Sequence, residues 1–481
     1  MDSDLSISAS RSKPLVAGGY RELLIIAIPM VISSSTQSMM HVVDRVLLTW
    51  YSEQAVAAAL PAGILFWSCL SLPFGVVSYA NAFVAQYDGA KQPVRVAASV
   101  WQAAYFATIC GLLIMLVSPL SGPLFRLVGH EAGVQVLESQ YFSWLCLGAV
   151  SALLPAALSC FFSGRGRTDL VLLVNASSVL VNALLDYVMI FGWGPFSEWG
   201  MAGAAIATNL ANIYSVACYF VLLSRGDARK KYEFWKHWRF DRVLTFDLLK
   251  FGGASGVQMF LDVAGFTAFM MMIGWIGTRE LAATNIAFNL NTLAFSPVIG
   301  VGIAVSTLVG QRIGERRPDL AAQSAWKGFM LAGGIMLFCG SMYVFAPQVL
   351  LAPYAYRADG VNFEEVRGVV IVLLRYVALY SFFDAMVIVF GSAVRAAGDT
   401  VFSMIATCLC AWGLLVLPTY LTWQLYGQNP DRSLLLNWSW IWCSIYVMTL
   451  GFVFLGRFCT GRWKTMSVIH HESAPLPETH P

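Results

Sequence analysis

Charged residues are scarce in this chain. Of its 481 residues only 12% are Asp, Glu, Lys or Arg, whereas 58% are hydrophobic, and the mean hydropathy is +0.66. In soluble domains about a quarter of the residues are charged. The composition therefore predicts an integral membrane protein.

Motifs for catalysis and for metal binding are also missing. The ten cysteines form no CxxC pair and are scattered through apolar runs, except for Cys408 and Cys410, so they are interpreted as small core residues. No GxxxxGK[ST], GxSxG or HExxH pattern occurs. The first 20 residues are polar, so no cleavable signal peptide is expected. We predict a protein that is not an enzyme, uses no cofactor and draws no energy from ATP.

Long apolar runs, by contrast, occur twelve times, and each can cross about 30 Å of hydrocarbon. They lie near residues 23–50, 56–85, 96–120, 142–162, 170–191, 201–223, 251–276, 281–309, 321–345, 369–394, 401–423 and 438–455. Lys and Arg crowd both tails, the central connection and the connections after even-numbered runs. The positive-inside rule then predicts that both termini are cytoplasmic, in a plasma membrane or a bacterial inner membrane.

The two halves of the chain repeat. Gly75-Val76, Gln86, Gly89 and Pro93 recur 225 residues later as Gly300-Val301, Gln311, Gly314 and Pro318. Each copy has six spans, an even number, so both copies enter the membrane in the same sense and form parallel repeats. We predict an all-α integral membrane fold of twelve transmembrane helices in two six-helix bundles, with the substrate site near their interface.

A basic segment at 225–250 separates the six spans of one copy from those of the other. We expect a cytoplasmic tail at 1–20, an N-lobe at 21–224, this linker at 225–250, a C-lobe at 251–461 and a second cytoplasmic tail at 462–481. The mixture of Lys, Arg, Trp and Phe in the linker fits either nucleic-acid binding or an amphipathic segment at the membrane surface. Its position between membrane spans favours the membrane surface.

One apolar run carries an acid. Asn175, Ser178, Asn182 and Asp186 fall within about 60° of arc on a helix, so they form one polar stripe. A charged side chain at bilayer depth costs at least about 2.5 kcal/mol, and such groups normally face a bundle interior or a watery cavity. A functional role is favoured over that of a structural, hydrogen-bonded Asp.

A second polar stripe in the first span contains Ser34, Gln37, His41 and Asp44. Asp44 and Asp186 each lie six residues before the outer end of their span, about 9 Å below it at about 1.5 Å per residue, so we predict that they meet. Two carboxylates in low dielectric must share a proton or bind a cation. Asp44, Asn182 and Asp186, together with the Thr208 hydroxyl, offer oxygen ligands for Na⁺.

His41 is the one histidine within a span and titrates near neutral pH. Two roles remain open for it: a part in proton coupling, or only a hydrogen bond to Asp44 on the same helix.

The second half also carries polar stripes. Their residues are Ser255, Gln258 and Asp262 in the seventh span, Asn285, Asn289, Thr292 and Ser296 in the eighth, and Tyr380 and Asp384 in the tenth. Interhelical hydrogen bonding explains such stripes as well as function does. We nevertheless expect Asp262, Asp384, Asn285 and Asn289 to contribute to coupling in the C-lobe. We expect Gln37, Gln258 and Tyr380 to line the substrate cavity and Pro29 to be a hinge.

These segments resemble the multidrug and toxic compound extrusion (MATE) family over residues 20–460. The resemblance rests on IPMVISSSTQSMMHVVDRVLLTW, VNALLDYVMIFG with GMAGAAIAT, AATNIAFNLNTLAF and YSFFDAMVIVFGSAVRAAGDT. It implies a V-shaped, two-lobed antiporter that exports amphipathic, often cationic compounds in exchange for Na⁺ or H⁺. By position, Asp44, Asn182, Asp186 and Thr208 match the family's N-lobe cation or proton site. Asp262 and Asp384 match its C-lobe acids, with Asp262 at a position where one branch usually has Glu.

We therefore predict a secondary active multidrug efflux antiporter that works by alternating access on drug-like substrates, as a monomer in the lipid bilayer. A flippase for lipid-linked saccharides is an alternative, but it needs a cationic cavity, and within the spans only Arg45 and Arg375 favour one. A channel or a receptor is a further alternative.

Overall fold

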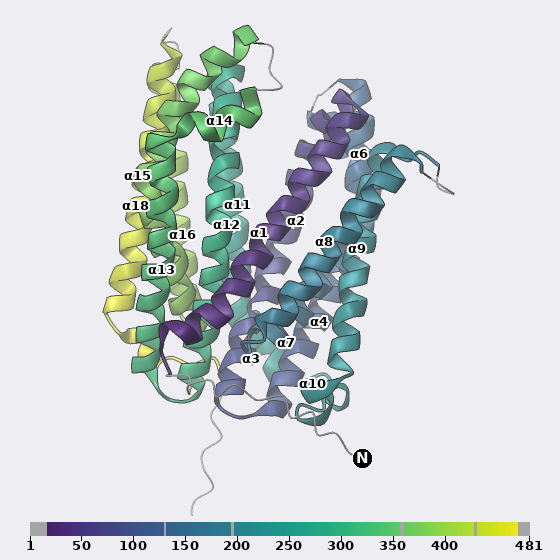
Figure 1. Cartoon of the computed structure of the whole chain (residues 1–481), viewed down its shortest axis with the longest axis vertical. Coiled ribbons are helices and arrows are strands. Elements are labelled where there is room, and N and C mark those ends of the chain that lie inside the picture. The colour runs from purple at the N-terminus through teal and green to yellow at the C-terminus, as the bar shows by residue number, and fades with distance from the viewer. Residues whose placement is uncertain (1–16, 129–130, 194–196, 356–359, 428–430, 470–481) are drawn as a thin grey trace, which may run out of the picture.

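The computed structural model describes residues 17–128, 131–193, 197–355, 360–427 and 431–469. Within these ranges the chain is helical and contains no strand. Two helix bundles stand side by side, meet at the lower end of Figure 1 and diverge toward its upper end. The predicted all-α fold with two lobes is confirmed.

The N-lobe contains α1 (Tyr20–Tyr51), α2 (Glu53–Ser78), α3 (Ala80–Gly89), α4 (Pro93–Met115), η1 (Ser118–Leu120), α5 (Ser121–Val128), α6 (Ala132–Leu147), α7 (Ala149–Ser163), α8 (Thr168–Phe191) and α9 (Gly200–Leu223). The linker contains α10 (Gly226–Lys230) and η2 (Phe234–Lys236). The C-lobe contains α11 (Arg242–Ile276), α12 (Thr278–Gly314), α13 (Pro318–Phe345), α14 (Pro347–Ala355), α15 (Gly360–Ala397), α16 (Thr400–Cys410), η3 (Ala411–Val416), α17 (Leu417–Tyr426), α18 (Arg432–Cys459) and η4 (Arg462–Thr465).

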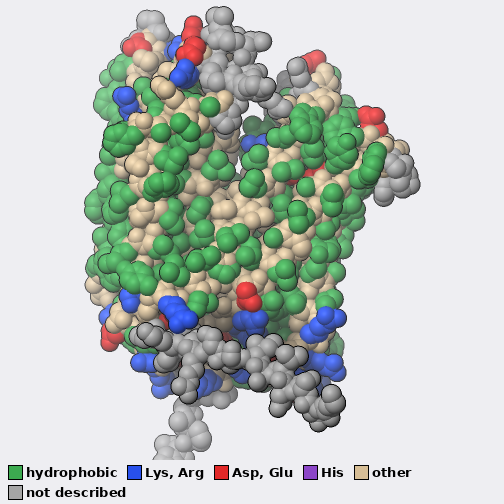
Figure 2. Space-filling view, in the orientation of Figure 1, with side chains coloured by type: hydrophobic (Ala, Val, Ile, Leu, Met, Phe, Trp, Pro, Cys, Tyr) green, Lys and Arg blue, Asp and Glu red, His purple; other side chains and the backbone are tan. Residues whose placement is uncertain are grey.

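The number of spans agrees with the twelve predicted. Among the described residues, eleven continuous helical stretches are long and apolar enough to cross a membrane, and α6 with α7 forms a twelfth span, bent by 45°. Gly148 lies at this bend, between the two helices. Figure 2 shows hydrophobic side chains over the middle of the molecule and Lys and Arg side chains along its lower rim.

The linker is shorter than predicted. Asp241 caps α11, because its carboxylate accepts hydrogen bonds from the backbone N–H groups of Val243 (3.0 Å) and Leu244 (3.1 Å). The helix therefore begins at Arg242 rather than after residue 250. The first two turns of α11 carry charged residues beside apolar ones, a pattern that is also typical of a linker.

Each lobe takes the start of a helix from the other half of the chain. Leu23, Ile26 and Ala27 of α1 belong to the hydrophobic core of the C-lobe, and Leu244 and Leu248 of α11 belong to that of the N-lobe. The predicted boundaries at 21 and 251 therefore do not divide the cores. The exchange joins the lobes at their lower ends.

Glycines related by the repeat allow this close approach. A Cβ atom on Gly89 would overlap the backbone of Gln311, and a Cβ atom on Gly314 would overlap the backbone of Gln86. Because Gln86 and Gln311 are also related by the repeat, the two contacts are equivalent. The sequence repeat is thus a structural repeat about an axis between the lobes.

Candidate functional site

The N-lobe acids lie together inside the bundle. Asp186 of α8 is 0% exposed and Asp44 of α1 is 8% exposed. Asp186 lies close enough to both Asp44 and Asn182 to interact with their side chains. Within the described part of the chain, neither carboxylate oxygen of Asp186 makes a hydrogen bond of ordinary geometry. The structure therefore brings together the acids predicted to meet.

The polar stripe on α8 divides into two parts. At its lower end, Asn175 donates a hydrogen bond to the Ser33 hydroxyl (2.7 Å), and Ser178 donates to the Ala211 carbonyl (2.9 Å). At its upper end, Asn182 is 0% exposed, and its amide atoms make no ordinary hydrogen bond within the described residues. The lower part of the stripe joins helices, whereas the upper part leaves polar groups available to a cation.

Two polar side chains of α6 have no role in the prediction from the sequence. Tyr141 lies within electrostatic range of Asp44 and Asp186. Glu138, one turn earlier, is fully buried. The predicted fourth span began at residue 142, so both residues fell in a connecting loop. The signal in the sequence is a single acid within an apolar stretch.

Of the other residues predicted for the N-lobe, Thr208 and Pro29 have described side chains. The Thr208 hydroxyl donates to the Ala204 carbonyl of its own helix (3.0 Å), which leaves its oxygen able to accept a further ligand. The His41 side chain lies outside the described residues. Pro29 lies inside α1, where the helix continues without a break, and a Cβ atom on Gly300 of α12 would meet the backbone of Met30 and Val31.

The C-lobe acids lie around an aromatic side chain. Tyr446 of α18 is within electrostatic range of both Asp262 on α11 and Asp384 on α15. Asp384 is buried, whereas Asp262 is only half-buried. Arg395, near the end of α15, is within electrostatic range of Asp262, although the two form no direct ion pair among the described contacts.

Two residues predicted to line the substrate cavity lie instead in the packed C-lobe. Gln258 is buried and donates to the Thr407 hydroxyl (3.0 Å), which joins α11 to α16. Tyr380 is 2% exposed and belongs to the C-lobe core. Polar side chains of this kind are expected at a hydrated cavity, but in this structure packing between helices buries both of them. Asn285 is half-buried on α12.

A polar contact joins the two lobes across the space where they diverge. Figure 2 shows a hollow between the two lobes at the upper end, with Lys or Arg atoms visible inside it. Arg45 of α1 donates across the lobes to the side chain of Asn289 on α12 (3.5 Å). Asn289 is therefore exposed and contacts the N-lobe, which separates it from the C-lobe acids with which it was grouped. Gln37 is also exposed on α1.

The lower end is closed by hydrogen bonds between the lobes. The Tyr79 hydroxyl donates to the Arg395 carbonyl (2.8 Å), and Gln86 donates to the Ala396 carbonyl (2.7 Å). The Gln86 side-chain oxygen accepts from the backbone N–H of Val468 (3.0 Å). The end of α15 and the chain after α18 are therefore both held by the N-lobe.

A buried polar contact lies above this closure. Asn81 donates to the Thr307 hydroxyl (3.3 Å) and accepts from the Ser163 hydroxyl (2.6 Å). Since Thr307 belongs to α12 and the other two to the N-lobe, this contact also joins the lobes.

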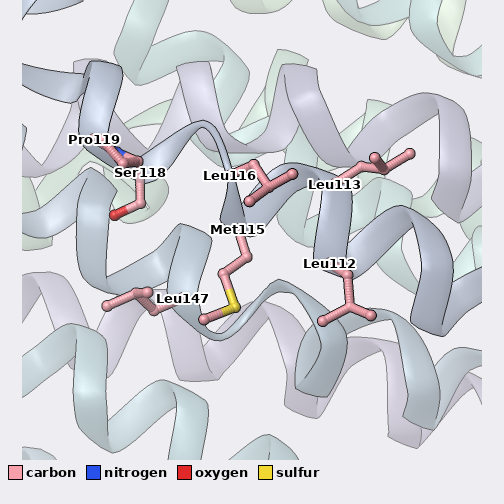
Figure 3. A pocket seen from close by; sticks show the side chains of 7 residues that line it. All are labelled: Leu112, Leu113, Met115, Leu116, Ser118, Pro119 and Leu147. Carbon is pink, nitrogen blue, oxygen red and sulfur yellow. The ribbon is translucent and has the colours of Figure 1, made fainter.

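An apolar pocket of about 390 Å³ lies apart from all these groups. It is lined by Leu112, Leu113, Met115, Leu116, Ser118, Pro119 and Leu147, which surround the end of α4 in Figure 3. Several of the lining leucines are highly exposed. The pocket is a lipid-facing depression and holds none of the four acids.

The described donor groups of this site are two carboxylates and one amide, and the His41 side chain lies outside the described residues. No group of three or more His, Cys, Asp or Glu side chains that could hold a metal ion occurs among the described residues. The two N-lobe carboxylates and the Asn182 amide supply oxygen donors of the kind that bind hard cations.

Twelve spans, two repeated bundles and buried acids on facing helices define a membrane transporter with two lobes. The MatE family model matches residues 29–188 and 254–421, so the chain belongs to the MatE family of transporters and is not an enzyme.

Individual relatives agree with this membership. A probable multidrug resistance protein NorM of Thermotoga maritima is 24% identical over 456 residues, which cover 94% of this chain and 95% of the relative. A multidrug resistance protein NorM of Burkholderia vietnamiensis is 26% identical over 390 residues, covering 81% and 84%.

Solved structures share the fold. A multidrug resistance MATE family transporter of the MOP superfamily, in an outward-facing conformation, superposes with a TM-score of 0.82 at 21% identity, covering 93% of this chain and 97% of the other. A eukaryotic MATE transporter gives a TM-score of 0.79 at 17% identity, covering 92% and 96%.

Proposed function

We propose that this chain is a secondary active multidrug efflux antiporter, which exports amphipathic, often cationic organic compounds in exchange for Na⁺ or H⁺. The observation that carries the proposal is the buried pair Asp44 and Asp186, with the Asn182 amide beside it. Two carboxylates in this position cannot both remain ionised without a counter-charge. An entering cation supplies that charge.

The charge balance at this pair determines what each residue does in the transport cycle. A cation bound at Asp44 and Asp186 neutralises the pair and changes how α1 packs against α8. Pro29 removes one backbone hydrogen bond from α1, so this helix bends there at low cost. Bending moves the upper part of α1, which borders the space between the lobes, and displaces the drug. Asp262, with one carboxylate oxygen buried and without an ordinary hydrogen bond among the described residues, binds the cationic substrate.

Orientation follows from the distribution of charge. The closed lower end carries the basic rim in Figure 2, so the positive-inside rule assigns it to the cytoplasm together with both termini. The hollow between the lobes then faces outward, in a plasma membrane or a bacterial inner membrane. The substrate site and both acid clusters lie within one chain, so a monomer suffices for the cycle.

The names of the relatives support drug export, because both NorM proteins are called multidrug resistance proteins. A flippase for lipid-linked saccharides would need cations facing the substrate. The buried charges described here are mainly acidic, which favours a cationic substrate instead.

Inverted membrane vesicles test the proposal. An outward Na⁺ or H⁺ gradient across these vesicles should drive ethidium uptake, and Asp44→Asn should abolish the effect of the gradient. Asp384→Asn shows whether the C-lobe acid is also needed. Uptake at the same rate without any cation gradient would contradict antiport and indicate a channel.

A further inference from the structure

The linker between the lobes is fixed against the lower end of the N-lobe. Phe234 is fully buried, its ring lies 5.3 Å from that of Trp101, and the Trp101 indole N–H donates to the Phe234 carbonyl (2.9 Å). The Arg165 guanidinium lies 3.9 Å from the centre of the Tyr232 ring. The linker is therefore a folded element rather than a loose connection.

The Tyr232 hydroxyl adds a further anchor, since it donates to Asp88 (2.6 Å). Burial, together with this hydrogen bond to Asp88, raises the pKa of Tyr232 to about 12. The phenol keeps its proton at neutral pH, so the anchor persists under physiological conditions.

Fixing the linker leaves five large apolar side chains facing outward. They are Trp235, Trp238, Phe240, Val243 and Phe246, between 41% and 68% exposed, and we call them the linker platform. Aromatic side chains, Trp above all, are typical of the headgroup region of a bilayer, where an apolar ring and a polar N–H group are both satisfied.

The length of α11 is compatible with a platform at that depth. This helix has 35 residues and is therefore about 52 Å long at about 1.5 Å per residue, whereas the hydrocarbon core is about 30 Å thick. The excess length allows its first turns, which carry Val243 and Phe246, to extend beyond the hydrocarbon into the headgroups. A nucleic acid would have to approach the same surface through the membrane interface.

The segment that carries the platform is rich in cations, and acids within it form ion pairs. Residues 225–250 contain eight Lys and Arg but four Asp and Glu. Asp241 pairs with Arg95 (2.7 Å) and Asp227 with Arg165 (3.9 Å), so two linker acids neutralise cations from outside the linker. Glu233 pairs with Lys236 (2.6 Å).

Seven exposed cations of this segment lie in no ion pair among the described contacts, and two of them, Lys231 and Lys250, lie over aromatic rings. Four of the others are Arg229, Lys230, Arg239 and Arg242, and we call these the four unpaired cations of the platform. A phosphate group beside them would complete the charge balance. Guanidinium groups bind phosphate oxygens through two parallel hydrogen bonds.

We propose that the linker platform and its four unpaired cations form a binding surface for anionic phospholipids of the leaflet at this end of the molecule. The aromatic side chains enter the boundary between headgroups and acyl chains, and the cations bind the lipid phosphates. The linker continues directly into α11, the helix that carries Asp262, so bound lipid holds one end of that helix in place.

Native mass spectrometry of the purified full chain tests this proposal. The protein is equilibrated in mixed micelles with equal amounts of phosphatidylglycerol and phosphatidylcholine, and the lipid that stays bound is counted. We expect wild-type protein to retain phosphatidylglycerol preferentially. The quadruple variant Arg229→Gln, Lys230→Gln, Arg239→Gln and Arg242→Gln should lose this preference by about tenfold.

Matched variants distinguish a specific lipid-binding site from a general effect of positive charge. The variant Arg316→Gln, Arg317→Gln, Arg462→Gln and Lys464→Gln removes the same charge from the α12–α13 connection and from η4 and should retain the lipid. Changing Arg229, Arg239 and Arg242 to Lys should keep most of it, which also checks that the segment still folds. Trp238→Ala with Phe240→Ala should weaken retention without any change of charge.

Three results would overturn the proposal. They are equal retention of the two lipids by wild-type protein, equal loss in both quadruple variants, and displacement of the lipid by a single-stranded DNA oligonucleotide at equal phosphate concentration. No transport is measured, so the outcome is independent of the proposed antiport.

Discussion

Asn182 and Asn175 lie on one stripe of α8 and have opposite surroundings. Asn175 is satisfied by Ser33, whereas the Asn182 amide is buried beside Asp186 without an ordinary hydrogen bond among the described residues. Periodicity places the two amides on the same face but cannot tell which has a partner, because the partners come from other helices. Burial and hydrogen bonding separate the two roles.

We predict that Asn182→Leu weakens cation binding without destabilising the protein. Losing one hydrogen bond to a charged group costs about 1.5–3 kcal/mol, so the half-saturating cation concentration for ethidium export should rise about tenfold to hundredfold. The thermal midpoint should stay the same or rise, since a buried amide without ordinary hydrogen bonds is replaced by an apolar group. The thermal midpoint is measured on the purified protein, and the half-saturating cation concentration is measured after reconstitution into liposomes.

Asn175→Leu is the matched control on the same helix. It removes the hydrogen bond to Ser33 and should lower the thermal midpoint, while the half-saturating cation concentration stays unchanged. If the two variants behaved alike, the division of the stripe into a structural and a functional part would be wrong.

At the scale of helices, the spans and the repeat could be predicted from the sequence because hydropathy and residue spacing are local signals. The predicted helix boundaries are wrong where charged residues stand among apolar ones. Helix α11 begins eight residues before the predicted end of the linker. The span that contains Glu138 begins at Ala132 rather than near residue 142. Equal depth in two spans was enough to predict that Asp44 and Asp186 meet, whereas the contact of Arg45 with Asn289 follows from tertiary packing and has no signal in the sequence.

The repeat makes a prediction about paired glycines. Gly89→Ala and Gly314→Ala should each lower the thermal midpoint by a similar amount, because each added Cβ atom overlaps the backbone of a repeat-related glutamine. Such overpacking typically costs about 1–3 kcal/mol. Differential scanning fluorimetry of the purified variants measures the effect.

Gly334→Ala provides the control, since a Cβ atom there meets nothing within 4 Å. A large loss at one member of the pair and none at the other would contradict the equivalence of the two contacts.

At the scale of the whole molecule, alternating access requires the closed lower end to open once in each cycle. Asn81 and Thr307 face each other across this closure, with 3.3 Å between the amide nitrogen and the hydroxyl oxygen. We predict that the double variant Asn81→Cys with Thr307→Cys loses export when an oxidant joins the two thiols, and regains it with a reductant.

The single variant Asn81→Cys, treated in the same way, accounts for the ten native cysteines. Full export by a cross-linked double variant would show that the lobes need not separate at this end.

The central claim is that the pair Asp44 and Asp186 exchanges a coupling cation for the drug, and counterflow measures this directly. Proteoliposomes with no imposed ion gradient receive ethidium on one side, and the movement of Na⁺ or H⁺ in the opposite direction is recorded for wild-type protein and Asp186→Asn. The account predicts a cation flux that depends on ethidium in the wild type and none in the variant. An equal cation flux per ethidium in the variant would contradict it.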